Sequence, residues 1–187
     1  MNSPANLLPA VQKIIATPDL PDLGPARRPG TMSADLLTRE LNKTLAGQAL
    51  DPTKQQLILG CALFWHDHLD PAHHIAQEIP SADGNLLHAM MHRREPDFDN
   101  AKYWFRRVGQ HACYPIVARR LREFSGARDK KLFDQLLPNG QWNPFAFVDA
   151  CAEGKLRPIA GPKRALLQEI QRMEFESFLE SLFNSNP

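Results

Sequence analysis

Cysteine is scarce in this sequence, and the few that occur are far apart. The 187 residues include three cysteines, Cys61, Cys113 and Cys151, and no two of them form a CxxC pair. An odd number of well-separated cysteines is not the pattern of a disulfide-stabilised secreted domain. The chain also lacks a basic segment followed by an apolar run near its start, which a secretory leader requires. We therefore expect reduced thiols and a cytoplasmic protein.

Long apolar runs and a strong net charge are missing as well. No stretch approaches the roughly 18 consecutive apolar residues of a membrane-spanning helix, so we expect no membrane partner. The net charge is only +1, so no global field attracts nucleic acid. Residues 93–131 do hold eleven Lys and Arg against five Asp and Glu. Because no nucleic-acid-binding motif accompanies this local excess, nucleic acid remains a disfavoured partner.

Strand patterns are missing too, because no segment alternates polar and apolar residues with β-branched enrichment. Apolar residues instead recur every three or four positions, and the 16 prolines divide the chain into helix-length segments. We expect at least seven helices, over approximately 4–16, 33–45, 51–65, 71–80, 84–95, 97–108, 114–124, 129–137, 144–153 and 162–183. The expected N-terminal caps are Ser33, Asp51, Asp70 and Asn143.

With 43% hydrophobic residues, the chain is large enough for one core. We therefore expect a compact all-α fold in which residues 1–187 form a single domain. Residues 17–30 contain four prolines and two glycines, which predicts an extended connection over 17–32 packed on the body of the domain. The last expected helix is long and amphipathic, with these apolar residues inward: Leu166, Ile170, Met173, Phe178 and Leu182.

The densest polar segment is HAMMHRREPDFDNAKYWFRRVGQH, residues 88–111, which holds three of the seven histidines. On the expected helix 84–95, His88, His92 and Glu95 share a stripe opposite the apolar face. Two histidines one turn apart can chelate a divalent metal, and a carboxylate one turn further can add an oxygen ligand. The same residues can also serve as catalytic acids or bases.

Established metal motifs are not present at this stripe. A zinc metalloprotease needs HExxH, whereas residues 88–92 read HAMMH, and a di-iron site needs paired ExxH motifs, whereas only HRRE occurs. His66 and Asp67 match the HD pair of HD-domain phosphohydrolases, but residues 1–65 lack the further histidine that this family needs. We therefore favour the absence of a metal. The histidines would then hydrogen-bond neighbouring helices, and Glu95 would pair with Arg94 or an arginine of the next helix.

A third histidine, His73, lies on the preceding short helix and could face His88 and His92 across a helical hairpin. This convergence predicts a pocket for a small polar or anionic ligand, with histidine acid–base or metal-assisted hydrolytic chemistry as the associated reaction class. Basic side chains would supply charge-assisted hydrogen bonds. The expected ligand-binding residues are His73, Arg93, Lys102, Tyr103, Arg106 and His111.

Residues 95–108, EPDFDNAKYWFRRV, resemble the second half of a tetratricopeptide or Sel1-like repeat. The matching positions are Asp97, Phe98, Ala101, Trp104 and Phe105. Because no second copy follows at the repeat spacing, the resemblance implies one central helical hairpin. On a helical wheel of residues 97–108, Trp104 and Phe105 fall on the apolar side, so we expect both in the core. It also implies an alternative function, a non-catalytic interaction module that presents Arg and Tyr to an acidic peptide.

Residues 63–111 also resemble a family of uncharacterised bacterial and fungal proteins. The shared signature is DxxH followed by HxxxHRRExDxxNxKYWFRRxGxH, and residues 142–151, WNPFAFVDAC, are in keeping with it. In this chain the signature begins at Asp70 and His73 and continues from His88 to His111. The resemblance implies no particular activity or cofactor.

Overall fold

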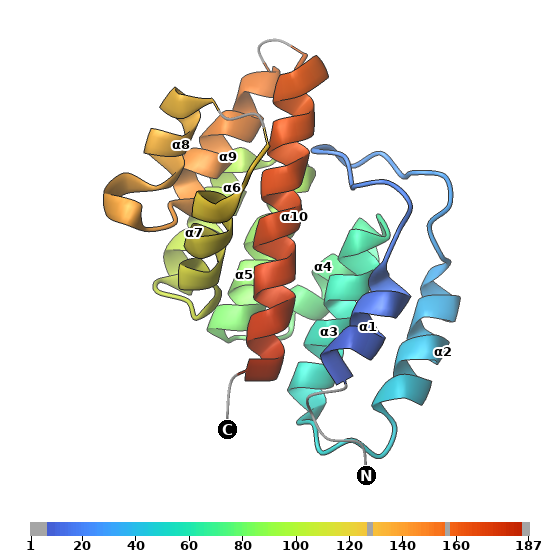
Figure 1. Cartoon of the computed structure of the whole chain (residues 1–187). Coiled ribbons are helices and arrows are strands. Elements are labelled where there is room, and N and C mark those ends of the chain that lie inside the picture. Colours follow the sequence, from blue (N-terminus) through green and yellow to red (C-terminus); the bar gives the residue numbers. More distant parts are fainter. Residues whose placement is uncertain (1–6, 127–128, 156–157, 185–187) are drawn as a thin grey trace.

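Figure 1 shows the computed structural model of the chain, which describes residues 7–126, 129–155 and 158–184. Within those ranges the backbone forms ten α-helices and no strand, so the expected all-α fold is confirmed. The helices are α1 (Leu7–Ile15), α2 (Ala34–Leu45), α3 (Pro52–Trp65), α4 (Leu69–Gln77), α5 (Ala82–Arg94), α6 (Phe98–Val108), α7 (Cys113–Glu123), α8 (Lys130–Leu136), α9 (Pro144–Ala152) and α10 (Gly161–Asn184).

Polar caps and prolines set most helix starts, as the sequence predicts. Ser33, Asp51 and Asn143 each accept a hydrogen bond from a backbone N–H in the first turn of the helix that follows. The expected cap at Asp70 is wrong, because α4 begins at Leu69. The Ala72 N–H donates to the His68 carbonyl at 3.2 Å, so the helix extends one residue earlier. Proline is tolerated there because first-turn N–H groups need no helical acceptor.

Helices α5 and α10, which hold more buried residues than any other described helix, form the middle of the molecule. In Figure 1, α10 runs the length of the fold, with α6–α9 on one side of it and α1–α4 on the other. Helix α5 packs against α3, α4 and α6, while α10 packs against α3 and α7. Ten of the 13 residues of α5 are buried, and they include both histidines and both arginines.

The long C-terminal helix is buried on more sides than an amphipathic helix would be. Four of the five expected inward residues are buried, and Leu166 is only half-buried. However, α10 also buries four polar residues, Gln171, Glu174, Ser177 and Ser181. Over residues 167–182, only a stripe of polar side chains that includes Arg172, Glu176 and Glu180 stays half-exposed, so most of the circumference of this part of α10 belongs to the core.

The segment 17–32 contains no helix or strand and lies against the helical body. The Arg28 backbone N and Nε donate to Asp67 Oδ2 at 3.0 and 2.7 Å. Gln171 Nε2 donates to the Pro21 carbonyl at 3.2 Å, and Arg94 Nη2 donates to the Gly24 carbonyl at 3.1 Å. Asp67, half of the HD pair, therefore holds this segment in place.

Candidate functional site

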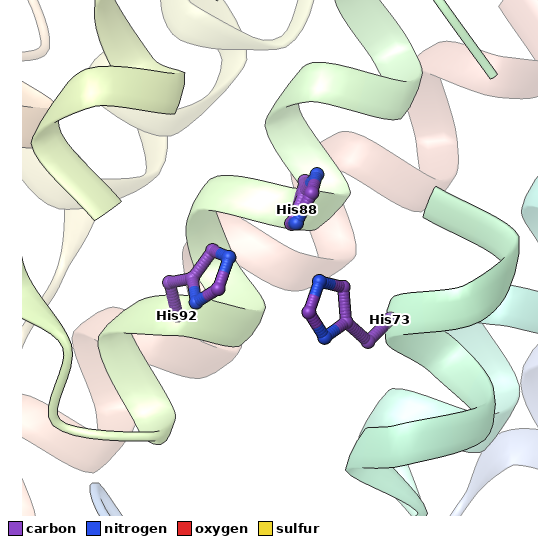
Figure 2. Close-up of side chains that lie close together, drawn as sticks. All are labelled: His73, His88 and His92. Carbon is purple, nitrogen blue, oxygen red and sulfur yellow. The ribbon is translucent and has the colours of Figure 1, made fainter. Parts of the chain in front are cut away.

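Three histidines from two helices gather at one point beside α5. His73 extends from α4, while His88 and His92 lie one turn apart on α5, and Figure 2 shows the three rings facing a common point. One ring nitrogen of each lies within 4.8 Å of the others. The ring centroids are 4.6 Å (His73–His88), 4.9 Å (His73–His92) and 4.7 Å (His88–His92) apart. The structure thus brings His73 to the pair that the helical stripe of α5 suggests.

A tight turn between α4 and α5 places His73 opposite the other two histidines. Ser81 caps α5 by accepting a hydrogen bond from the Gly84 N–H at 3.1 Å. A Cβ at residue 84 would lie 2.0 Å from the Ile79 carbonyl oxygen, so only glycine fits this close approach. The histidine cluster, meaning His73, His88 and His92, therefore depends on the shape of this turn.

Two histidines of the cluster, His88 and His92, lie where the neutral imidazole is favoured. Burial, reinforced by His92 and His73, lowers the pKa of His88 to about 3. Burial and then His73 also lower the pKa of His92. Within the described part of the chain, the buried atoms His88 Nε2 and His92 Nδ1 have no hydrogen-bond partner. Buried polar nitrogens are rarely left unpaired, and a neutral imidazole with a free nitrogen is the form that binds metal.

Two polar side chains orient His92 from outside the cluster. Glu95 Oε2 lies 3.3 Å from His92 Nδ1, an ion-pair distance without hydrogen-bond geometry. Asn100 of α6 places Nδ2 3.1 Å from His92 Nε2. Such partners commonly fix the orientation of a metal-binding histidine. Glu95 thus pairs with His92 and not with Arg94, whose Nη2 lies 2.8 Å from Asp67 Oδ1.

Helix α6 adds an aromatic wall to the histidine cluster. The Trp104 ring stacks on the His88 ring at a centroid distance of 4.0 Å and an interplanar angle of 23°. Trp104 is half-buried, so the expectation of a core side chain holds only in part, whereas Phe105 is 1% exposed. Asn100, which contacts His92, and Trp104, which contacts His88, lie four residues apart on α6, and Arg107 continues this stripe three residues further on. Sequence reasoning missed this stripe because a wheel does not show which side of α6 faces α5.

Arg93, an expected ligand-binding residue, lies elsewhere in the core. Its side chain is fully buried, and its Nη2 is 2.5 Å from Glu174 Oε2 on α10. Its guanidinium carbon lies 4.2 Å from the Phe147 ring centroid. Arg93 is therefore a partner of α9 and α10, not of the cluster.

The expected basic residues of α6 do not converge on the histidines either. Lys102 Nζ is 2.5 Å from Asp149 Oδ1 of α9, and Arg106 is exposed. Tyr103 is 45% exposed, and its ring meets the Trp104 ring edge-on at 5.3 Å. Three of the expected ligand-binding residues lie on α6, and of these Tyr103 is the one that contacts Trp104.

His111 joins a separate polar chain at the start of α7. Its Nε2 lies 2.8 Å from Asp83 Oδ1, and its Nδ1 lies 3.1 Å from both the backbone N and Sγ of Cys113. A cysteine, a histidine and an aspartate in contact in this order resemble a catalytic triad, in which the histidine activates the thiol as a nucleophile. However, Cys113 is fully buried, and burial raises the pKa of its thiol well above the usual value. His111 therefore anchors the start of α7 to α5.

A cleft elsewhere in the described part of the chain does not coincide with the histidine cluster. It has a volume of about 430 Å³ and lies between α7 and the segment that joins α8 to α9, with Tyr114, Trp142 and Phe145 among its lining residues. None of the cluster histidines lines it. We place the candidate site at the histidine cluster, because converging nitrogens are chemically specific and an apolar cleft is not.

Comparisons of the chain with protein-family models, with curated proteins and with solved structures found no match. Among the residues that the structure describes, no helix combines the length and the apolar character that crossing a membrane would require. A function must therefore be argued from the geometry of the cluster itself.

Proposed function

We propose that the protein binds a divalent transition metal, with zinc as the first candidate, through His73, His88 and His92. The supporting observation is the convergence of three imidazole nitrogens within 4.8 Å of one another. Three histidines with a fourth position open to water or substrate form a common ligand set of catalytic zinc. The sequence alone favoured no metal, because its pattern matches no established ligand set and the position of His73 was only an expectation. The third histidine changes that balance.

The present spacing fits this ligand set after a modest contraction. Zinc–nitrogen bonds of about 2.0–2.1 Å place the nitrogens of a tetrahedral site roughly 3.3 Å apart. The cluster nitrogens lie within 4.8 Å, so small rotations about the side-chain bonds bring them to one ion. His73 is the least buried of the three and supplies most of this movement.

The associated chemistry is metal-assisted hydrolysis of a small polar or anionic substrate. A metal ion would lower the pKa of a bound water and polarise a substrate carbonyl or phosphoryl oxygen. The protein's part is to present three imidazole nitrogens and a nearby base. Glu95 is suited to that second role, because burial raises the pKa of its carboxyl group and makes it a better proton acceptor.

Metal titration tests the proposal. Untagged protein, purified without metal-affinity resin and stripped with chelator, is titrated with zinc by calorimetry. We expect one equivalent to bind, and His73→Ala, His88→Ala and His92→Ala each to weaken binding by about tenfold or more. His74→Ala is the matched control, because His74 is exposed on the same helix. Absence of binding, or equal losses in the control and cluster variants, would overturn the proposal.

A second candidate function is the interaction module, and one observation favours it. Tyr103 is 45% exposed, an unusual degree for a large apolar side chain in this molecule, and the adjoining Arg106 and Arg107 are also exposed. This surface could bind an acidic peptide through aromatic and guanidinium contacts. Binding of a poly-glutamate peptide to wild type, lost in Tyr103→Ala and unaffected by zinc or by His88→Ala, would favour this function over the metal site.

A further inference from the structure

We infer that Arg107, and not the neighbouring Arg106, binds the far end of the ligand held at the metal, and that this ligand is a small linear dicarboxylate. The inference rests on the proposed metal site and specifies its ligand class. One carboxylate would occupy the open metal position, while the other would reach the Arg107 guanidinium.

A row of ring contacts leads from the histidine cluster to Arg107. The His88 ring stacks on Trp104 at 4.0 Å. The guanidinium carbon of Arg107 then lies 5.4 Å from the Trp104 ring centroid and 5.9 Å from the Tyr103 ring centroid. Arg107 is exposed, but contact with two aromatic rings restricts where its cation lies. Arg106 makes no such contact within the described residues, although it is the next residue along the chain.

The charge of Arg107 is not neutralised by a neighbouring carboxylate. Other basic side chains of this region do have acidic partners, such as Lys102 with Asp149 and Arg120 with Glu176. In the described ranges, no Asp or Glu lies within ion-pair distance of Arg107. An unpaired, oriented guanidinium beside the histidine cluster is a site for an anion, because its planar donors match the two oxygens of a carboxylate.

The separation of the two binding groups selects the length of the ligand. The Trp104 indole contacts both groups, with the His88 ring 4.0 Å and the Arg107 guanidinium carbon 5.4 Å from its centroid. A ligand with a single carboxylate, such as acetate, has no second charged group for Arg107 once that carboxylate is bound at the metal. A dicarboxylate with several methylene groups can span the indole edge, so that its chain packs on apolar surface while its ends are bound.

Cobalt makes the inference measurable, because anions that enter the coordination sphere of Co²⁺ change its visible absorption. Cobalt-loaded protein is titrated with acetate and with the linear dicarboxylates from malonate to adipate. We expect one chain length to bind at least about tenfold more tightly than acetate, which corresponds to one charge-assisted contact. Arg107→Gln should remove this gain, while Arg106→Gln, an equally exposed control, should retain it.

The outcomes separate the two proposals. If cobalt does not bind, both the proposed metal site and the inference on Arg107 are wrong. If cobalt binds but no dicarboxylate exceeds acetate, or if Arg107→Gln retains the gain, the inference on Arg107 is wrong and the metal site stands. Equal losses in both arginine variants also overturn it, because they indicate a general effect of surface charge. Circular dichroism of each variant verifies that the fold is intact.

Discussion

The buried position of His88 disfavours its protonated form. The protonation of His88 is therefore linked to the stability of the fold. Its side chain is buried, and its pKa in the folded protein is about 3 instead of the usual 6.5. The unfolded chain therefore takes up a proton at a pH where the folded protein does not. Stability is fully present above pH 6.5 and is lost as the pH falls toward 3.

This difference predicts acid sensitivity in the metal-free protein. Between pH 6.5 and 4, His88 alone should lower the free energy of unfolding by about 1.4 kcal/mol per pH unit. Urea unfolding at several pH values measures this slope. We expect His88→Gln to show a shallower slope than wild type, and His74→Gln, an exposed control, to match wild type. Equal slopes in all three proteins would mean that other groups dominate the acid response.

The side chains around the cluster illustrate what a helical wheel can and cannot predict. His88 and His92 were identified because their spacing of four residues places them together on any helix. The place of Arg93 could not be predicted, because a helical wheel gives the direction of a side chain but not the helix that it meets, here α10 through Glu174. Arg107 was overlooked for the same reason, since its partner Trp104 was expected to point wholly inward.

At the scale of elements, the turn between α4 and α5 controls the spacing of the cluster. A methyl group at residue 84 would collide with the Ile79 backbone carbonyl at 2.0 Å. Gly84→Ala should therefore destabilise the protein by about 1–3 kcal/mol, although the same change at an unobstructed helix position stabilises by roughly 1 kcal/mol. It should also weaken zinc binding, because the turn positions His73.

Urea unfolding and zinc titration of the Gly84→Ala protein measure both effects. The matched control is Gly24→Ala, since a Cβ at residue 24 would have nothing within 4 Å. We expect this control to change stability by no more than about 0.5 kcal/mol. A stabilised Gly84→Ala protein would show that the turn has room and does not set the histidine spacing.

Helix boundaries were predictable where a residue next to the boundary caps the helix. They were less predictable where contacts with distant parts of the chain determine the structure. Ser33, Asp51 and Asn143 cap helices through their own side chains, so the neighbouring residues suffice to identify them. The start of α4 at Leu69 was missed, because the first turn accommodates Pro71 inside the helix. The burial of Glu174 and Gln171 on α10 has no local signal, since their partners lie on α5 and in the segment 17–32.

At the scale of the whole molecule, one buried ion pair joins α5 to α10. Arg93 and Glu174 are both fully buried, with Nη2 and Oε2 at 2.5 Å. Glu174→Ala should cost about 3–5 kcal/mol, because Arg93 would remain as an uncompensated buried charge. The double variant Arg93→Met/Glu174→Met should cost less than that single change, because it removes both charges.

Urea unfolding of the single and double variants measures this coupling. Asp149→Ala, which breaks the surface pair with Lys102, is the control and should cost no more than about 1 kcal/mol. If Glu174→Ala were as mild as the control, the interior around Arg93 would have to admit water. The same result would return Arg93 to consideration as a ligand-binding residue.

The central position of α10 has a consequence for the synthesis of the protein. Gln171 contacts Pro21 across 150 positions of sequence, and Glu174 contacts Arg93 across 81. Contacts of such long range form late, because the intervening chain must first be brought together. On the ribosome, α1 to α9 therefore emerge before the helix that completes their core. During that interval the apolar faces that α10 later covers are exposed, so chaperones that bind nascent chains would act on this protein until α10 emerges.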